Sequence, residues 1–274
     1  MGAVECPPPP ASRPRRRRGR RSYPVWLYRR LTARVRPLPD FLVIGAQKCG
    51  TTSTYGYLAR HPRVERAWRK EVRFFDAPSN YALGEAWYRA HFAIRRPGMV
   101  TGEATPGYMF YADTPARMAR HVPRARLVAL VRNPVDRALS HYHFLARGGR
   151  ESRPLETALA EQPLALPAAP GEDADTYLAR GLYAEQLERV LGLFPREQLL
   201  VLTTEHLRDR TEEAVASIVA FLRLPPWRVN VSRRRNTGRY EAMPPRLRQH
   251  LGALFRPHNQ RLYDLLGRDL GWDG

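Results

Sequence analysis

The sequence predicts an α/β fold in which a central, mainly parallel sheet is flanked by helices. Three short apolar runs support this prediction, at residues 41–44, 127–131 and 198–202, because strands that are covered on both faces read as continuous apolar stretches. A segment with helical spacing follows each run, and such alternation is typical of parallel sheets. With 274 residues and 43% hydrophobic content, the chain can bury one sizeable core.

Residues 1–39 differ in composition from the rest of the chain. They combine four prolines at 7–10 with arginine runs at 15–18 and 20–21, and they supply much of the formal net charge of +20. This composition cannot bury enough apolar surface to offset the entropy of the chain. We therefore predict a disordered basic tail over 1–39, with an optional interfacial helix near 26–35, and one domain over 40–274.

The charge and the cysteine content bear on location and partners. A basic tail attracts anions in general, so contact with an anionic membrane or a polyanion is one alternative, without specificity for nucleic acid. No apolar run of 18 or more residues occurs in the first 40, which argues against a signal peptide or an anchor. Cys6 and Cys49 are the two cysteines, so no disulfide framework is expected. We predict a cytoplasmic protein, with peripheral membrane contact as the alternative.

The first strand, at 41–44, leads into the loop G-A-Q-K-C-G-T-T-S at 45–53, and a helix is expected from 51 to 60. Backbone N–H groups at such a helix start bind anions. The nucleotide triphosphatase pattern G-x-x-x-x-G-K-[ST] is not met, because Thr51 follows Gly50 and the lysine lies inside the loop at Lys48. The loop therefore suits a ligand with one phosphate followed by a transferable group.

The second strand, at 127–131, runs into Arg132, Asn133 and Pro134, and a helix is expected over 135–146 with the proline in its first turn. The third strand, at 198–202, lies between expected helices at 176–194 and 212–222. Residues 158–175 are expected to form a long loop, and residues 244–266 a C-terminal helical stretch.

These motifs, taken in order, resemble sulfotransferases that use 3′-phosphoadenosine-5′-phosphosulfate (PAPS). The branch that is most similar in motif contains the heparan sulfate 3-O-sulfotransferases and the N-deacetylase/N-sulfotransferases. The loop at 45–53 is similar to the family's 5′-phosphosulfate loop, K-E-V-R-F-F-D at 70–76 to the segment with the catalytic glutamate, and G-E-A-T-P-G-Y at 102–108 to a substrate-cleft segment. R-N-P-V-D-R-A-L-S-H-Y at 132–142 resembles the 3′-phosphate segment, and R-R-N-T-G-R-Y at 234–240 the loop that closes on the nucleotide.

The resemblance implies a P-loop-like three-layer fold in a bacterial-type member, with no metal in the site. Glu71 is implied as the general base, and Lys48 as the cation that stabilises charge on the departing oxygen. The product would be adenosine 3′,5′-bisphosphate. Cofactor contacts are expected from Lys48, Cys49, Gly50, Thr51, Thr52, Ser53, Arg132, Ser140, Tyr183, Arg235, Thr237, Gly238 and Arg239, and acceptor contacts from Arg73, Glu103 and Tyr108.

Structural roles for several of these residues remain as alternatives. Glu71 could be a surface carboxylate paired with Lys70 or Arg73, and Arg132 could form a salt bridge with Asp136. Glu103 could orient the acceptor or Lys48, or could equally pair with Arg132. A structure distinguishes these alternatives, because each predicts a different burial and different bonding partners for the side chain concerned.

The predicted function is transfer of sulfonate from PAPS to a hydroxyl or amine of an acceptor, with a carbohydrate or glycoconjugate favoured. One alternative is a P-loop phosphotransferase, which calls for a lysine directly after Gly50 and an acidic strand end that holds magnesium. A second is a non-enzymatic binder of polyanions or membrane surfaces that acts through the basic tail. The sequence does not choose between O- and N-sulfation, and it does not indicate the oligomeric state.

Overall fold

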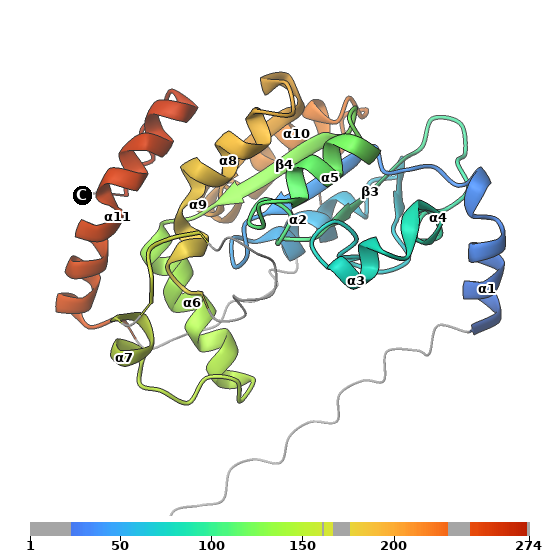
Figure 1. The fold of residues 1–274 in the computed structure, drawn as a ribbon. Coiled ribbons are helices and arrows are strands. Elements are labelled where there is room, and N and C mark those ends of the chain that lie inside the picture. Colours follow the sequence, from blue (N-terminus) through green and yellow to red (C-terminus); the bar gives the residue numbers. More distant parts are fainter. Residues whose placement is uncertain (1–22, 161, 167–175, 230–241, 273–274) are drawn as a thin grey trace, which may run out of the picture.

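A five-stranded, wholly parallel sheet forms the centre of the protein (Figure 1). The computed structural model describes residues 23–160, 162–166, 176–229 and 242–272. The strand order is β2-β3-β1-β4-β5. The strands are β1 (Phe41–Gly45), β2 (Val64–Arg66), β3 (Val100–Ala104), β4 (Arg126–Val131) and β5 (Leu199–Thr203).

The order of the strands places a topological switch point between β1 and β4. After β1 the chain forms β2 and β3 on one side of it, whereas β4 and β5 extend the sheet on the other side. Ligands of open α/β sheets bind at the carboxyl ends of the strands at such a point. Every residue of β1 is buried, as a strand covered on both faces requires.

Helices lie on both faces of the sheet (Figure 1). α2 contacts β1, β3 and α10, and α11 packs against α8 and α6. The helices are α1 (Tyr23–Leu31), α2 (Thr51–Leu58), α3 (Pro78–Tyr81), α4 (Gly84–Arg89), α5 (Thr114–His121), α6 (Pro134–Arg147), α7 (Leu155–Ala160), α8 (Tyr183–Leu191), α9 (Thr204–Asp209), α10 (Thr211–Phe221) and α11 (Pro245–Leu266), with 3₁₀ turns η1 (Ala33–Val35), η2 (Ala179–Gly181) and η3 (Arg196–Gln198).

The fold class and the three predicted strands are confirmed, and the helices predicted at 51–60, 135–146, 212–222 and 244–266 are present as α2, α6, α10 and α11. The single helix predicted at 176–194 is wrong, since η2 and α8 occupy this stretch separately. A Cβ on Gly181 would lie 2.9 Å from both Phe255 and Pro134, so the chain turns here at a close approach to α11 and α6. The predicted loop at 158–175 begins later, because α7 continues to Ala160.

Residues 23–39 do not have the disorder expected of a basic tail. The Arg29 side chain donates hydrogen bonds to the carbonyls of Ala90 and Phe92, each at 2.7 Å. Arg36 is only 3% exposed and donates to the Phe92 carbonyl at 2.8 Å. Arginine stems pack on apolar surface while the guanidinium bonds to backbone, so a basic composition did not prevent docking here. Residues 1–22 lie outside the described residues.

None of the helices in the described part of the chain is both long enough and apolar enough to cross a membrane.

Candidate active site

The loop between β1 and α2 is held in place by backbone contacts on two sides. Ala46 N donates to the Leu130 carbonyl at 2.7 Å, and the Thr204 hydroxyl donates to the Cys49 carbonyl at 2.9 Å. Gly50 precedes α2 with φ of 93°, a left-handed conformation that glycine adopts without strain. The first backbone N–H groups of α2 therefore face the carboxyl edge of the sheet as an anion site.

Lys48 lies half-buried in this loop, with its Nζ atom 4.2 Å from the centre of the Phe144 ring. Burial, followed by the positive charges of Arg147, Arg132 and Arg137, lowers the pKa of Lys48 to about 8. An anion bound at this place would reverse that electrostatic cost, because an opposite charge favours the protonated amine.

Arg132 and Ser140 lie on either side of the turn from β4 into α6. Asn133 begins the helix, and its side chain accepts hydrogen bonds from the N–H groups of Val135 and Asp136 at 3.0 and 3.3 Å. Asp136 forms an ion pair with Arg248 at 2.5 Å, so the alternative pairing with Arg132 is not formed. Among the described residues the Arg132 guanidinium has no hydrogen-bond or ion-pair partner.

Positive charge accumulates at this edge of the sheet. We call Lys48, Arg132, Arg137, Arg147 and Arg180 the cationic cluster, since they shift the pKa values of one another or of their buried neighbour His141. The pKa of His141 falls to about 2, mainly because of burial and then because of the cluster, so this histidine stays neutral. A cluster of cations in a partly desolvated place suits a ligand with several negative charges.

The segment that carries Glu71 is tied to the carboxyl end of the neighbouring strand β3. Glu71 N donates to the Ala104 carbonyl at 3.1 Å, and Arg73 N donates to the Thr105 hydroxyl at 3.3 Å. The Glu71 side chain is 46% exposed and forms an ion pair with Lys70, as the structural alternative expected. Its carboxylate remains accessible to an acceptor, and the guanidinium of Arg73 bonds to Asp76 at 3.3 Å.

The side chains of Glu103 and Tyr108, which the sequence predicts to contact the acceptor, bond to other residues of the protein, and their acceptor contact stays a prediction. Both are completely buried. Glu103 accepts hydrogen bonds from the hydroxyls of Tyr88, Tyr108 and Thr105 at 2.9, 2.6 and 2.8 Å, and from Val72 N at 3.1 Å. These bonds use the carboxylate to fix the backbone that follows Glu71, and they leave no contact between Glu103 and Arg132.

Cys49 and Tyr183, which the sequence predicts to contact the cofactor, have buried side chains that bond within the protein, and their cofactor contacts stay predictions. Cys49 is 0% exposed and its N–H donates to the Ala46 carbonyl at 3.2 Å. Tyr183 is 1% exposed, and its hydroxyl donates to the Arg132 carbonyl at 3.0 Å. Burial raises the pKa of the Cys49 thiol to about 11. Tyr183 thus positions Arg132.

The remaining expected contacts stay predictions. In the first turn of α2, Thr51 is buried whereas Thr52 and Ser53 are partly exposed, so the latter two hydroxyls are the accessible ones. The residues expected in the closing loop lie outside the described residues; they are Arg235, Thr237, Gly238 and Arg239.

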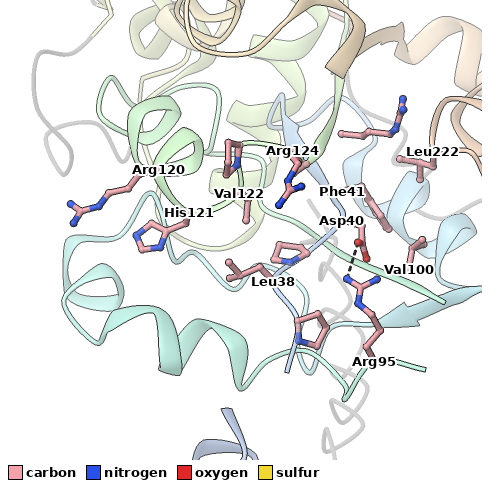
Figure 2. Close-up of a pocket in the computed structure, with 15 residues that line it drawn as sticks. Leu38, Asp40, Phe41, Arg95, Val100, Arg120, His121, Val122, Arg124 and Leu222 are labelled. Carbon is pink, nitrogen blue, oxygen red and sulfur yellow. Dashed lines mark hydrogen bonds and ion pairs between the residues drawn. The ribbon is translucent and has the colours of Figure 1, made fainter. Parts of the chain in front are cut away.

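A cavity of about 850 Å³ lies elsewhere, at the amino-terminal edge of the sheet (Figure 2). Asp40, Phe41, Val100 and Arg126 line it at the starts of β1, β3 and β4, and Asp40 bonds to Arg95 at 2.8 Å. Because parallel strands run away from this edge, the cavity is at the opposite end of the sheet from the loop and Arg132. It is therefore separate from the candidate site. Nowhere in the described ranges do three or more His, Cys, Asp or Glu side chains gather in a way that could hold a metal.

Two residues of the site were missed by the sequence analysis. Phe144 lies under the Lys48 ammonium, and Arg137 belongs to the cationic cluster. Both lie on α6 within one turn of Ser140, at spacings of four and three residues, and helical residues so spaced share a face. The helical spacing from Ser140 would have predicted that Phe144 and Arg137 lie at the site.

A parallel sheet with a loop suited to anions after β1, and after β4 an arginine without a partner among the described residues, defines a class of protein that binds a phosphate-bearing ligand at the carboxyl edge of the sheet. The family comparison is more specific, because residues 38–243 match the family described as "Sulfotransferase domain". The chain belongs to this family and is a PAPS-dependent sulfotransferase.

Relatives and a solved structure agree with this assignment. The chain is 32% identical to human heparan sulfate glucosamine 3-O-sulfotransferase 6, over 86% of this chain and 74% of the relative. It is 30% identical to human bifunctional heparan sulfate N-deacetylase/N-sulfotransferase 2, over 84% of this chain and 30% of that longer protein. The crystal structure of a sulfotransferase from Alicyclobacillus acidocaldarius superimposes with a TM-score of 0.76 at 33% identity, covering 87% of this chain and all of the other.

Proposed function

We propose that this sulfotransferase transfers sulfonate from PAPS to a hydroxyl or amine of a carbohydrate, without a metal ion. The observation that carries the proposal is the cationic cluster, which includes Lys48 of the loop, and whose Arg180 acts electrostatically on Asp76 in the segment that carries Glu71. The phosphate groups of PAPS carry the negative charge that would balance the positive charge of the cationic cluster. The names of the relatives favour an amino sugar as the acceptor, because one is a heparan sulfate glucosamine 3-O-sulfotransferase and the other a heparan sulfate N-deacetylase/N-sulfotransferase.

The residues divide the chemistry between them. Glu71 accepts the proton of the acceptor hydroxyl or amine. The acceptor atom forms a bond to sulfur while the bond from sulfur to the 5′-phosphate oxygen breaks, and that oxygen leaves with the electron pair. Lys48 and the N–H groups of α2 stabilise the charge that develops there. Arg132 and Ser140 bind the 3′-phosphate, where a guanidinium forms strong charge-assisted hydrogen bonds.

Calorimetric titration with adenosine 3′,5′-bisphosphate in the absence of magnesium tests the nucleotide site. We expect tight binding that Lys48→Ala or Arg132→Ala weakens strongly. The matched control is Arg126→Ala. Arg126 is the first residue of β4, at the end of the strand opposite to Arg132, so its loss should leave binding unchanged. A preference for ATP with magnesium over the bisphosphate would contradict the proposal.

Transfer of radiolabelled sulfonate from PAPS tests the acceptor. We expect labelling of desulfated heparan sulfate chains and of shorter glucosamine oligosaccharides, with the modified position read by mass spectrometry. Simple phenols serve as the comparison. Labelling of phenols without labelling of the glycans would overturn the carbohydrate assignment but leave the nucleotide site intact.

We also propose that α1 contacts an anionic membrane surface. Tyr23, Leu27 and Leu31 are 75, 46 and 77% exposed and recur at four-residue spacing, so they form an apolar stripe on one face of α1. Arg30 flanks the stripe, and the sequence adds arginine runs just before the helix. Apolar stripes flanked by cations bind at the interface of anionic bilayers. The cytoplasmic location expected from the sequence stays a prediction.

Sedimentation with vesicles tests this contact. We expect the protein to bind vesicles that contain phosphatidylserine and not those of phosphatidylcholine alone, with binding lost in a Leu27→Glu, Leu31→Glu double variant. Leu193→Glu is the control, because Leu193 is equally exposed at 50% but lies after α8. If the double variant binds as the wild type does, the helix contact is wrong, even where the basic tail still attracts polyanions.

A further inference from the structure

Arg137 has an unusual environment for a charged side chain. It is 0% exposed and is the largest fully buried side chain in the described part of the protein. Its Nη2 atom donates to the Tyr177 carbonyl, but Nε and Nη1 have no hydrogen-bond partner. Buried guanidinium groups are normally paired, because an unpaired buried charge is costly.

Among the described residues, no carboxylate is one of the groups that most affect the pKa of Arg137. Burial lowers the pKa of Arg137 to about 10, so the side chain still carries its charge at neutral pH. The side chains that next affect its pKa are Tyr183 and Cys49, and then Arg180 and Arg132. None of these is a carboxylate, and two of them are further cations.

Two acidic side chains near Arg137 have other partners, and a third, Glu205, accepts from Asn133 N at 3.4 Å through Oε1 while its Oε2 has no hydrogen-bond partner. Asp136, the adjacent residue, forms an ion pair with Arg248 at 2.5 Å. Glu151 pairs with Arg153 at 2.7 Å and accepts from the Tyr177 hydroxyl at 2.8 Å. Within the described residues, therefore, no carboxylate bonds to the Arg137 guanidinium or appears among the groups that most affect its pKa.

We propose that Arg137 is a positioning residue whose missing countercharge is supplied by the bound nucleotide. It does not touch the ligand; its field adds to that of Arg132 and its hydrogen bond holds the backbone at Tyr177. The inference rests on the proposed nucleotide site. Arg137 lies three residues before Ser140 on α6, so both occupy the same helix face.

In the free protein the buried charge of Arg137 is destabilising, whereas in the complex with nucleotide the same charge favours binding. A nucleotide that brings negative charge close to Arg132 relieves the repulsion within the cationic cluster. The same anion lowers the cost of the buried guanidinium, because charges interact strongly in a partly desolvated place. Nucleotide binding and the stability of the α6 region are thereby coupled.

Two substitutions separate charge from shape. Arg137→Met removes the charge and keeps an unbranched side chain, whereas Arg137→Lys keeps the charge. We expect Arg137→Met to bind adenosine 3′,5′-bisphosphate roughly tenfold more weakly, and Arg137→Lys to retain most of the affinity. In thermal unfolding the free Arg137→Met protein should be no less stable than the wild type, while its stabilisation by the nucleotide should be smaller.

The control is Arg36→Met, since Arg36 is also a buried arginine but is satisfied by the Phe92 carbonyl and by Thr32. We expect it to lower the melting temperature and to leave nucleotide affinity unchanged. Wild-type affinity in Arg137→Met, or an equal loss in both Arg137 variants, would overturn the inference. Absence of nucleotide binding in the wild type would instead overturn the proposed function.

An NMR measurement on the wild-type protein tests the proposal even if Arg137→Met does not fold. The Nε–H resonance of Arg137 can be assigned by comparison with Arg137→Lys. We expect it to shift when adenosine 3′,5′-bisphosphate is added to the wild type. No shift at saturating nucleotide would contradict the coupling.

Discussion

The Tyr108 hydroxyl donates a 2.6 Å hydrogen bond to Glu103 Oε1 beneath the segment that carries Glu71. The same hydroxyl accepts from Phe74 N at 3.0 Å, and Glu103 accepts from Val72 N at 3.1 Å. A buried carboxylate at the end of β3 thus fixes the N–H group of Val72 directly and that of Phe74 through the Tyr108 hydroxyl, in the segment that follows Glu71. Burial raises the pKa of Glu103, while the hydroxyls of Tyr108, Thr105 and Tyr88 oppose the rise.

Substitution of Glu103 tests this positioning role. Glu103→Gln replaces an acceptor oxygen by an NH₂ group that faces hydroxyl donors. We expect the free energy of unfolding to fall by about 1–3 kcal/mol and kcat to fall with it, with little change in nucleotide affinity. Chemical denaturation and steady-state kinetics measure the two effects. Glu85→Gln, which loses a more exposed carboxylate, should have a smaller effect; a larger loss of nucleotide affinity than of kcat in Glu103→Gln would place Glu103 in the binding site instead.

Substitution of Glu71 tests the general base. We expect Glu71→Gln to lower kcat by about 10²–10⁴-fold, the range of general-base contributions, because the amide cannot accept the acceptor proton. Binding of adenosine 3′,5′-bisphosphate measured by calorimetry should not change. Glu65→Gln, at a carboxylate on β2, is the control. Near-normal turnover in Glu71→Gln would assign the proton to another group.

The pKa of Lys48 predicts a dependence on pH. Because its folded pKa is about 8, Lys48 is charged below that pH and loses its charge above it. We therefore expect kcat/KM for PAPS to fall as the pH rises through about 8, and we expect Lys48→Arg to remove this limb of the profile. Nucleotide binding near this pH should take up a proton, which titrations in buffers of different ionisation enthalpy detect. A flat profile in the wild type would contradict the prediction.

Lowering of this pKa also affects the stability of the free protein. The unfolded chain holds the lysine proton to higher pH than the folded chain does, so stability should increase as the pH rises from about 8 toward the ordinary lysine value of 10.5. Lys48→Met should lose this increase. Denaturation at several pH values in both proteins measures it.

Gly107 allows a close approach between two site segments. A Cβ at this position would lie 2.4 Å from Asp76 Oδ2 and 3.1 Å from Tyr111. We expect Gly107→Ala to lower the free energy of unfolding by about 1–3 kcal/mol, as overpacking does. Gly252→Ala is the matched control, since nothing lies within 4 Å of its Cβ in α11, and it should stabilise the helix by roughly 0.5–1 kcal/mol. Equal effects of the two would contradict this reading.

The strands β2 and β3 and the short helices were the parts of the fold that the sequence did not predict. β2 reads Val-Glu-Arg and β3 reads Val-Thr-Gly-Glu-Ala, so neither has the continuous apolar run that marked β1, β4 and β5. Pairing with neighbouring strands stabilises β2 and β3 in the sheet, although their own sequences favour strands only weakly. In α1, likewise, hydrogen bonds from Arg29 to carbonyls about 60 residues away in sequence decided the position.

The sequence by itself determined the central strands, the anion-binding loop and the shared edge that brings Lys48 and Arg132 together. These follow from local patterns, because buried strands, glycine loops and helix starts depend on neighbouring residues. Only the tertiary structure decided which polar residues face the ligand. Glu103, Tyr108 and Tyr183 are buried by partners on other elements, and Arg137 is buried with two of its guanidinium nitrogens unbonded among the described residues. Burial is a property of the packed chain, and so a motif names the residues near a site without stating which side chains reach it.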